Sequence, residues 1–318
     1  MEITGNKNGA NDGARLLKPE YSIRNPVFST YLIGNAHLKV LARSRYEWTE
    51  GPVWFGDAGC LLFSDIPNNR ILRWSERTGI STFRSPSNFT NGNTRDRQGR
   101  LVSCEHGARR VTRTEYDGSI TVIADNFQGR RFNSPNDVVV KSDDSIWFTD
   151  PHYGIVSDYE GHRAEQELPC NVYRVDPSTG EVGVVAGELA CPNGLAFSSD
   201  ETRLYVSDTA RAYDPDGDPH IRRFDLDGDD RLVDRGVFHR IDVGKSDGFR
   251  LDTDGNIWSS AGDGVHCISP EGELLGKVLV PEKVSNLCFG GRARHVMFMT
   301  GFTSLYSIAL NRRGIQWP

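Results

Sequence analysis

The sequence predicts an all-β protein, a six-bladed β-propeller whose ring is closed by a strand from the N-terminal segment. Three observations favour this fold: short β-like runs dominate the chain, one type of run recurs six times, and the last repeat lacks an outer strand. Gly, Asp, Asn and Pro separate the runs, and no convincing helical periodicity interrupts them.

One apolar run marks each repeat. Its copies are "LLFSDI" (61–66), "LVSCEH" (101–106), "IWFTDP" (146–151), "LYVSDT" (204–209), "IWSSAG" (257–262) and "VMFMTG" (296–301). They recur roughly every 40 to 60 residues, which is typical of propeller blades with several strands each. In the first repeat, "PVWF", "LLFSD", "RILRW" and "STFR" predict the inner, second and outer strands.

The two ends of the chain predict how the ring closes. After "LYSIAL" (305–310), the sequence "NRRGIQWP" is a poor candidate for an outer strand. The run "LKVLARS" (38–44) precedes the first inner strand and can supply the missing one, which would cover open sheet edges. Residues 1–20 are predicted to be a flexible tail, and residues 21–318 a single propeller domain.

Composition excludes several classes of function. The net charge of −6 argues against a nucleic-acid partner, which would favour a basic face. No stretch approaches 18 apolar residues, so no membrane-spanning segment is predicted. The six cysteines show no C-x-x-C spacing and mostly lie in or beside apolar runs. We therefore expect reduced, buried cysteines in a cytoplasmic protein.

Counting back ten or eleven residues from each recurring run reaches a Glu, Asn or Asp in every repeat. These ring positions are Glu50, Asn91, Asn136, Asn193, Asp247 and Asn286. A residue just before an inner strand lies at one end of the central channel, so six blades would aim six oxygen-bearing side chains at one point. Such ligands without His or Cys favour a hard cation, Ca²⁺ before Zn²⁺, and the two acids would balance a dication. For any one position, simple turn formation is the alternative.

Two enlarged loops are expected on the same face as the ring. They span about 152–170 and 210–220, and both would overhang the ring as a lid. The first begins with His152 and Tyr153, which we expect to contribute to a substrate pocket. Plain insertion drift is the alternative explanation for both loops.

Five segments resemble a known family. They are "EGPVW" (50–54), "NGNTRDRQGRLVSCEHG" (91–107), "RFNSPNDVVVKSDDSIWFTDPHYG" (131–154), "CPNGLAFSSDETRLYVSDT" (191–209) and "SDGFRLDTDGNIW" (246–258). Together they are similar to the gluconolactonase branch of the SMP-30/gluconolactonase/luciferin-regenerating family. The likeness covers roughly residues 30–318, with motifs in five of the six repeats. It implies a six-bladed propeller that hydrolyses lactones with one divalent cation at the channel mouth.

The resemblance also implies roles for individual residues. The cation ligands match Glu50, Asn136, Asn193 and Asp247. Ring position Asn91 is then a candidate for contacting substrate, and Asn286 lines the channel. Arg131 resembles an arginine that some members use for sugar hydroxyls. His106 resembles a histidine of the more distant paraoxonases, and "DPHYG" departs from the pattern of many relatives at His152.

The predicted chemistry is opening of a sugar lactone such as D-glucono-1,5-lactone. Ca²⁺ is the expected cation, with Zn²⁺, Mg²⁺ and Mn²⁺ as alternatives, and a base must take a proton from the attacking water. We favour Asp247 as this base, and His106 is the alternative because its ordinary pKa suits neutral pH. Two other functions fit the same scaffold: a phosphotriesterase-like calcium hydrolase and a non-catalytic propeller that binds a partner.

Overall fold

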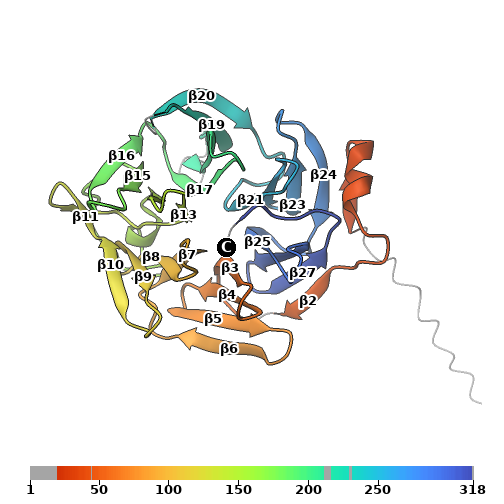
Figure 1. The fold of residues 1–318 in the computed structure, drawn as a ribbon, viewed down its shortest axis with the longest axis horizontal. Helices are drawn as coiled ribbons and strands as arrows, with labels where there is room; N and C mark the ends of the chain where they lie inside the picture. Colours follow the sequence, from red (N-terminus) through yellow and green to blue (C-terminus); the bar gives the residue numbers. More distant parts are fainter. Residues whose placement is uncertain (1–19, 44, 211–215, 229–230, 317–318) are drawn as a thin grey trace, which may run out of the picture.

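The structure is a computed structural model, and it describes residues 20–43, 45–210, 216–228 and 231–316. These residues form six antiparallel sheets arranged as blades around one axis, which confirms the predicted fold (Figure 1). Two short 3-10 helices, η1 (Pro26–Tyr31) and η2 (Tyr153–Ile155), are the only helices in this part of the chain. Neither is long and apolar enough to cross a membrane.

In each blade the strands follow one another outward from the axis. Blade one contains β3 (Thr49–Phe55), β4 (Cys60–Asp65), β5 (Arg70–Ser75) and β6 (Gly79–Arg84). Blade two contains β7 (Thr90–Arg95), β8 (Leu101–Glu105), β9 (Arg110–Thr114) and β10 (Ile120–Ala124). Blade three contains β13 (Val138–Val140), β14 (Ile146–Asp150), β15 (Asn171–Val175) and β16 (Val182–Ala186).

The last three blades follow the same plan. Blade four contains β17 (Pro192–Phe197), β18 (Arg203–Asp208), β19 (His220–Leu226) and β20 (Leu232–His239). Blade five contains β21 (Phe249–Leu251), β22 (Ile257–Ala261), β23 (Gly264–Ile268) and β24 (Leu274–Leu279). Blade six contains β25 (Val284–Gly290), β26 (Val296–Gly301) and β27 (Leu305–Ala309). A hairpin of β11 (Asn126–Phe127) and β12 (Arg130–Arg131) leads from blade two to blade three. The six recurring runs supply the second strand of every blade, as predicted.

The N-terminal segment closes the ring as predicted. Strand β2 (Lys39–Ala42) pairs antiparallel with β27 and becomes the fourth strand of blade six (Figure 1). Its register places Lys39 opposite Ser307 and Val40 opposite Tyr306. The first and last blades are therefore joined through one sheet made from both ends of the chain.

Strand β1 (Tyr21–Ile23) was not anticipated from the sequence. It pairs with β24 and gives blade five a fifth strand. Only three residues pair, too few for a periodic signal. Packing anchors this segment instead, because Phe28 of η1 is fully buried against blade five. A Cβ on Gly276 of β24 would lie 2.3 Å from the Phe28 ring, so only glycine admits this packing. Nearly all of the predicted tail, residues 1–19, lies outside the described residues.

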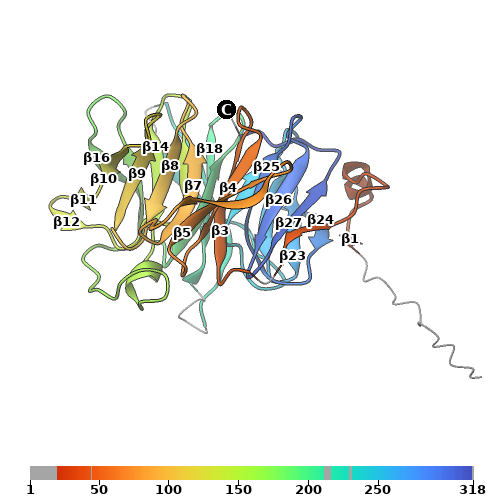
Figure 2. The same ribbon diagram turned by 90° about the horizontal axis from the view of Figure 1, so that it is seen from below.

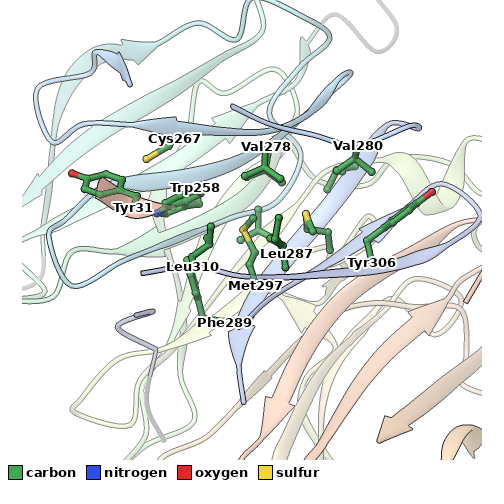
Figure 3. Packing of buried hydrophobic residues seen from close by; sticks show 14 of the residues in the cluster. Tyr31, Trp258, Cys267, Val278, Val280, Leu287, Phe289, Met297, Tyr306 and Leu310 are labelled. Atoms are coloured by element: carbon green, nitrogen blue, oxygen red, sulfur yellow. The ribbon is translucent and has the colours of Figure 1, made fainter. Parts of the chain in front are cut away.

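The interface between blades five and six shows how the core is built (Figure 3). Trp258 of β22 and Leu287 of β25 are fully buried there, next to Met297 of β26. Alternate residues of each strand face the neighbouring blade, so every interface between blades is an apolar layer. All six cysteines are buried, as predicted.

The two ends of the central channel carry different segments of the chain. The segment before the C-terminus reaches the axis, where Gly314 bridges Asp252 and Ile315 donates to the Leu251 carbonyl (Figure 1). The enlarged 152–170 loop lies on the opposite face (Figure 2). Inner strands begin at the loop end of the channel and finish at the end covered by the C-terminal segment.

Candidate active site

The six ring residues are buried where the inner strands begin. Their exposed fractions lie between 2% and 6%. The sequence placed all six before the strands, and this was wrong for four: Glu50, Asn91, Asn193 and Asn286 lie inside β3, β7, β17 and β25. Each of these strands has a register shift at its ring position. A bulge re-aims the local side chain, which directs it to the axis without ending the strand.

Glycines after the ring residues let neighbouring blades meet closely. A Cβ on Gly51, whose φ is +51°, would lie 2.2 Å from the Asn91 carbonyl oxygen. A Cβ on Gly92 would lie 2.3 Å from the Asn136 carbonyl oxygen, and the Gly92 N–H donates to that oxygen at 2.8 Å. Any larger residue would push adjacent ring positions apart.

Five of the six ring residues line one cavity of about 190 Å³ at this end of the channel. They are Glu50, Asn91, Asn136, Asn193 and Asp247. Asn286 does not line it but donates from Nδ2 to the Glu50 carboxylate at 3.0 Å. The Gly51 N–H donates to the same oxygen at 2.7 Å, so Glu50 is held in place by its neighbours.

Two buried carboxylates share this cavity. Burial raises the pKa of Glu50 well above its ordinary value, and the charge of Asp247 raises it further. Burial also raises the pKa of Asp247, while Lys283, Lys245 and a hydrogen bond from Asn193 lower it. Keeping both groups ionised is therefore costly unless a positive charge lies between them.

The donor set fits a hard divalent cation. Two carboxylates and two amides meet at the cavity, and nearby Asn91 Oδ1 is buried without a hydrogen-bond partner among the described residues. Among the described residues, no group of three His, Cys, Asp or Glu side chains is placed to hold a metal ion alone, so amide oxygens would have to complete the ligand set. Oxygen ligands of mixed charge are those of Ca²⁺.

His106 lies behind the cavity wall rather than on it. Its ring is completely buried, and burial lowers its pKa to about 4. Nδ1 lies 3.1 Å from the Glu160 carbonyl oxygen, and Nε2 lies 3.3 Å from Asn91 Nδ2. A carbonyl only accepts, so Nδ1 carries the proton and Nε2 accepts from the Asn91 amide. This bond fixes the Asn91 amide with its oxygen left for another partner.

The structure brings only part of the predicted substrate pocket together. Tyr153 lines the cavity. His152 is half-buried, stacks beside Tyr153 and contacts Cys170 Sγ through Nδ1 at 3.3 Å, away from the cavity wall. Arg131 lies on the exposed β11–β12 hairpin and donates to the Ala108 carbonyl at 3.0 Å. Neither His152 nor Arg131 is among the residues that line the cavity.

Four cavity residues were missed from the sequence: Trp48, Glu160, Lys245 and Lys283. Two of them could have been found from the sequence. Trp48 and Lys245 each lie two residues before a ring position, and alternate residues of an extended chain point to the same side. Glu160 comes from the 152–170 loop, and burial raises its pKa to about 7. Nothing in the sequence distinguishes it from the other acids of that loop. The second enlarged loop includes residues 211–215, which lie outside the described residues.

Comparison with known proteins identifies the family. Residues 48–303 match the SMP-30/gluconolactonase/LRE-like region. The chain is 31% identical over 294 residues to a gluconolactonase of Zymomonas mobilis, covering 85% of this chain and 80% of that protein. It is 28% identical to a 6-deoxy-6-sulfogluconolactonase of Pseudomonas putida, covering 84% and 87%. A gluconolactonase structure from Xanthomonas campestris superposes with a TM-score of 0.85 at 38% identity, covering 92% and 95%. The chain belongs to the SMP-30/gluconolactonase/LRE-like family.

Proposed function

We propose that this member of the SMP-30/gluconolactonase/LRE-like family hydrolyses the lactone of a sugar acid with the help of one divalent cation, Ca²⁺ before Zn²⁺, Mg²⁺ or Mn²⁺. One observation carries the proposal: two buried carboxylates and two amides from four different blades line one cavity at the mouth of the channel. Relatives named gluconolactonase at 31% and 38% identity support the reaction class.

Glu50, Asn136, Asn193 and Asp247 would hold the cation. A divalent cation at such a site supplies Lewis-acid chemistry, because it polarises a carbonyl oxygen and stabilises the charge that develops there. The buried environment strengthens every electrostatic interaction in the cavity. Trp48 and Tyr153 give the cavity an aromatic part of its lining.

Asp247 is the proposed general base. Its carboxylate lies in the cavity, whereas the His106 ring is completely buried behind Asn91 and its pKa is lowered to about 4. The hydrogen bond from Asn193 occupies one oxygen of the Asp247 carboxylate. The other oxygen can then accept the proton of the water that attacks the lactone carbonyl.

Asn91 is proposed to bind a substrate hydroxyl. Its Oδ1 is a buried acceptor without a partner among the described residues, and the bond from Nδ2 to His106 keeps Oδ1 from exchanging places with Nδ2. His106 thus acts through Asn91 as a positioning residue. The backbone carbonyl of Glu160 completes this chain of contacts from the enlarged loop to the ring.

The test is pH-stat hydrolysis of D-glucono-1,5-lactone by metal-stripped protein, re-supplied with Ca²⁺, Mg²⁺, Mn²⁺ and Zn²⁺ in turn. We expect no hydrolysis above the spontaneous rate without metal, and recovery with Ca²⁺ at one equivalent. Full activity of the stripped protein would contradict cation dependence. A fluorophosphate hydrolysed faster than every lactone tested would replace the lactonase assignment with a phosphotriesterase one.

A further inference from the structure

Two lysines face the cavity, and the carboxylates of Asp247 and Glu160 act on them only at longer range, without direct contact. Lys245 and Lys283 both line it, from the loops that precede the inner strands of blades five and six. Among the residues that the structure describes, no oxygen accepts a hydrogen bond from either ammonium group, and neither group forms a direct ion pair. Ammonium groups carry three donors each, and such groups near a protein interior are normally paired.

Aromatic rings hold the two ammonium groups in place. Lys283 Nζ lies 4.4 Å from the centroid of the Trp48 ring, and Lys245 Nζ lies 5.7 Å from the centroid of the Tyr153 ring. A ring face attracts a cation through its quadrupole and accepts no conventional hydrogen bond. These contacts orient both charges and leave their N–H donors available to a ligand.

The net charge of the cavity favours an anionic ligand once a dication is bound. Glu50, Asp247 and Glu160 line it with the two lysines. With all three carboxylates ionised beside a bound dication, the two ammonium groups leave the cavity with one net positive charge. A neutral sugar lactone would leave that excess uncompensated.

We propose that the preferred substrate is a lactone that carries a second, anionic group, a carboxylate, phosphate or sulfonate, bound by Lys245 and Lys283. The proposal rests on the lactonase function proposed above and names its substrate class. The lactone carbonyl lies at the ring of acids and amides, and the anionic group lies over blades five and six. Lysine binds such groups as a point charge, so the site selects charge more than geometry.

The kinetic test compares anionic and neutral lactones in the Ca²⁺-loaded enzyme. The substrates are 6-phospho-D-glucono-1,5-lactone, D-glucaro-1,4-lactone and neutral D-glucono-1,5-lactone, with spontaneous opening subtracted. We expect kcat/KM for an anionic lactone to exceed that for the neutral one by about tenfold or more, the scale of a hydrogen bond to a charged group. The phosphate and carboxylate arms show which anion is preferred.

Substitution of the two lysines tests whether they cause the preference for anionic lactones. Lys245→Met and Lys283→Met should each lower the ratio of anionic to neutral kcat/KM by about fivefold or more, and the double variant should erase it. Lys39→Met is the matched control, because Lys39 is exposed on β2 and the ratio should not change. A ratio near one in the wild type, or one that the double variant leaves intact, would overturn the proposal.

Binding measurements separate this proposal from the function on which it rests. Calorimetry with 6-phospho-D-gluconate and D-gluconate needs no turnover, and the wild type should bind the phosphorylated acid more tightly while the double variant does not discriminate. Equal binding of both acids by the wild type would reject the lysine site. Anion binding without hydrolysis of any lactone would instead reject the lactonase function and retain the lysine site.

Discussion

The two ends of the central channel differ in the volume of their cavities and in the charged residues that line them. The loop end holds a cavity of about 190 Å³ lined by Glu50, Asp247 and amides. The end beside the C-terminal segment holds a larger one, about 360 Å³, lined by Arg95, Arg97 and Arg250. The same inner strands connect both cavities, beginning at one and ending at the other.

The difference shows that the charges of a cavity, rather than its volume, single out the loop end as the candidate active site of this protein. At the larger cavity every arginine has an ion pair: Arg95 with Asp57 at 3.1 Å, Arg97 with Glu201 at 3.0 Å, and Arg250 with Asp137 at 3.3 Å. Two nitrogens of the buried Arg250 guanidinium, Nε and Nη2, have no hydrogen-bond partner among the described residues. At the smaller cavity the charge of Asp247 raises the pKa of Glu50, and neither lysine has an ion pair or a hydrogen bond to an oxygen among the described residues. Buried carboxylates with raised pKa values favour the loop end as the candidate ligand site.

Removing the acids of the loop end should give the largest effect. The double variant Glu50→Ala, Asp247→Ala lacks both charged ligands, so we expect tight Ca²⁺ binding to be lost. Activity should fall more than about 100-fold, because substitutions of residues that only support the ligands of a metal site already cost about 10- to 100-fold. Asp200→Ala is the matched control, because Asp200 is an acid that lines the opposite cavity. Full metal occupancy of the double variant in elemental analysis would show that these two acids do not hold the cation, and the contrast between the two channel ends would fail.

The substitution Asp247→Asn separates the role of Asp247 as a cation ligand from its role as a general base. Asp247→Asn keeps one ligand oxygen and the side-chain shape, so we expect weakened cation binding and activity lowered about 100-fold or more, the usual scale for loss of a general base. His106→Ala should cost less than about tenfold, because the ring acts through Asn91. Initial rates at saturating Ca²⁺ measure both. An active Asp247→Asn beside an inactive His106→Ala would make the imidazole the base.

The smallest effect on activity is expected from the opposite end. Arg97→Ala removes an ion pair with Glu201 at 3.0 Å and a bond to the Val140 carbonyl at 2.9 Å. We expect the free energy of unfolding to fall by about 1–3 kcal/mol, measured by urea denaturation. The kcat/KM should stay within about twofold, because distant sites act independently. Arg24→Ala, on the exposed outer rim, should alter neither quantity, and a large loss of activity in Arg97→Ala would mean that the two ends are coupled.

The repeats explain why most of the fold could be predicted. Six copies of one strand pattern determine blade number, and the missing outer strand after residue 310 identifies the N-terminal partner. Strand β1 could not be predicted, because three paired residues carry no period and Phe28 fixes the segment by packing. Likewise the bulges at Glu50 and Asn91 depend on close approach between blades, which no single repeat reveals.

The site was predictable where it repeats and unpredictable where it does not. The ring positions occur once in every blade, so spacing alone located them. Glu160 occurs once, in an irregular loop, and only the folded chain brings it to the cavity. Arg131 illustrates the converse, since a local likeness in sequence placed it near the substrate and the hairpin of β11 and β12 holds it at the surface.

The pairing of β2 with β27 in blade six determines when the propeller can close during synthesis. On the ribosome, β2 (Lys39–Ala42) emerges long before its partner β27 (Leu305–Ala309). At ordinary translation rates the interval lasts on the order of tens of seconds. Until then the nascent chain is an open arc of blades with unpaired strand edges, which favour aggregation and capture by chaperones. Ring closure therefore cannot begin until β27 has left the ribosome, long after β2.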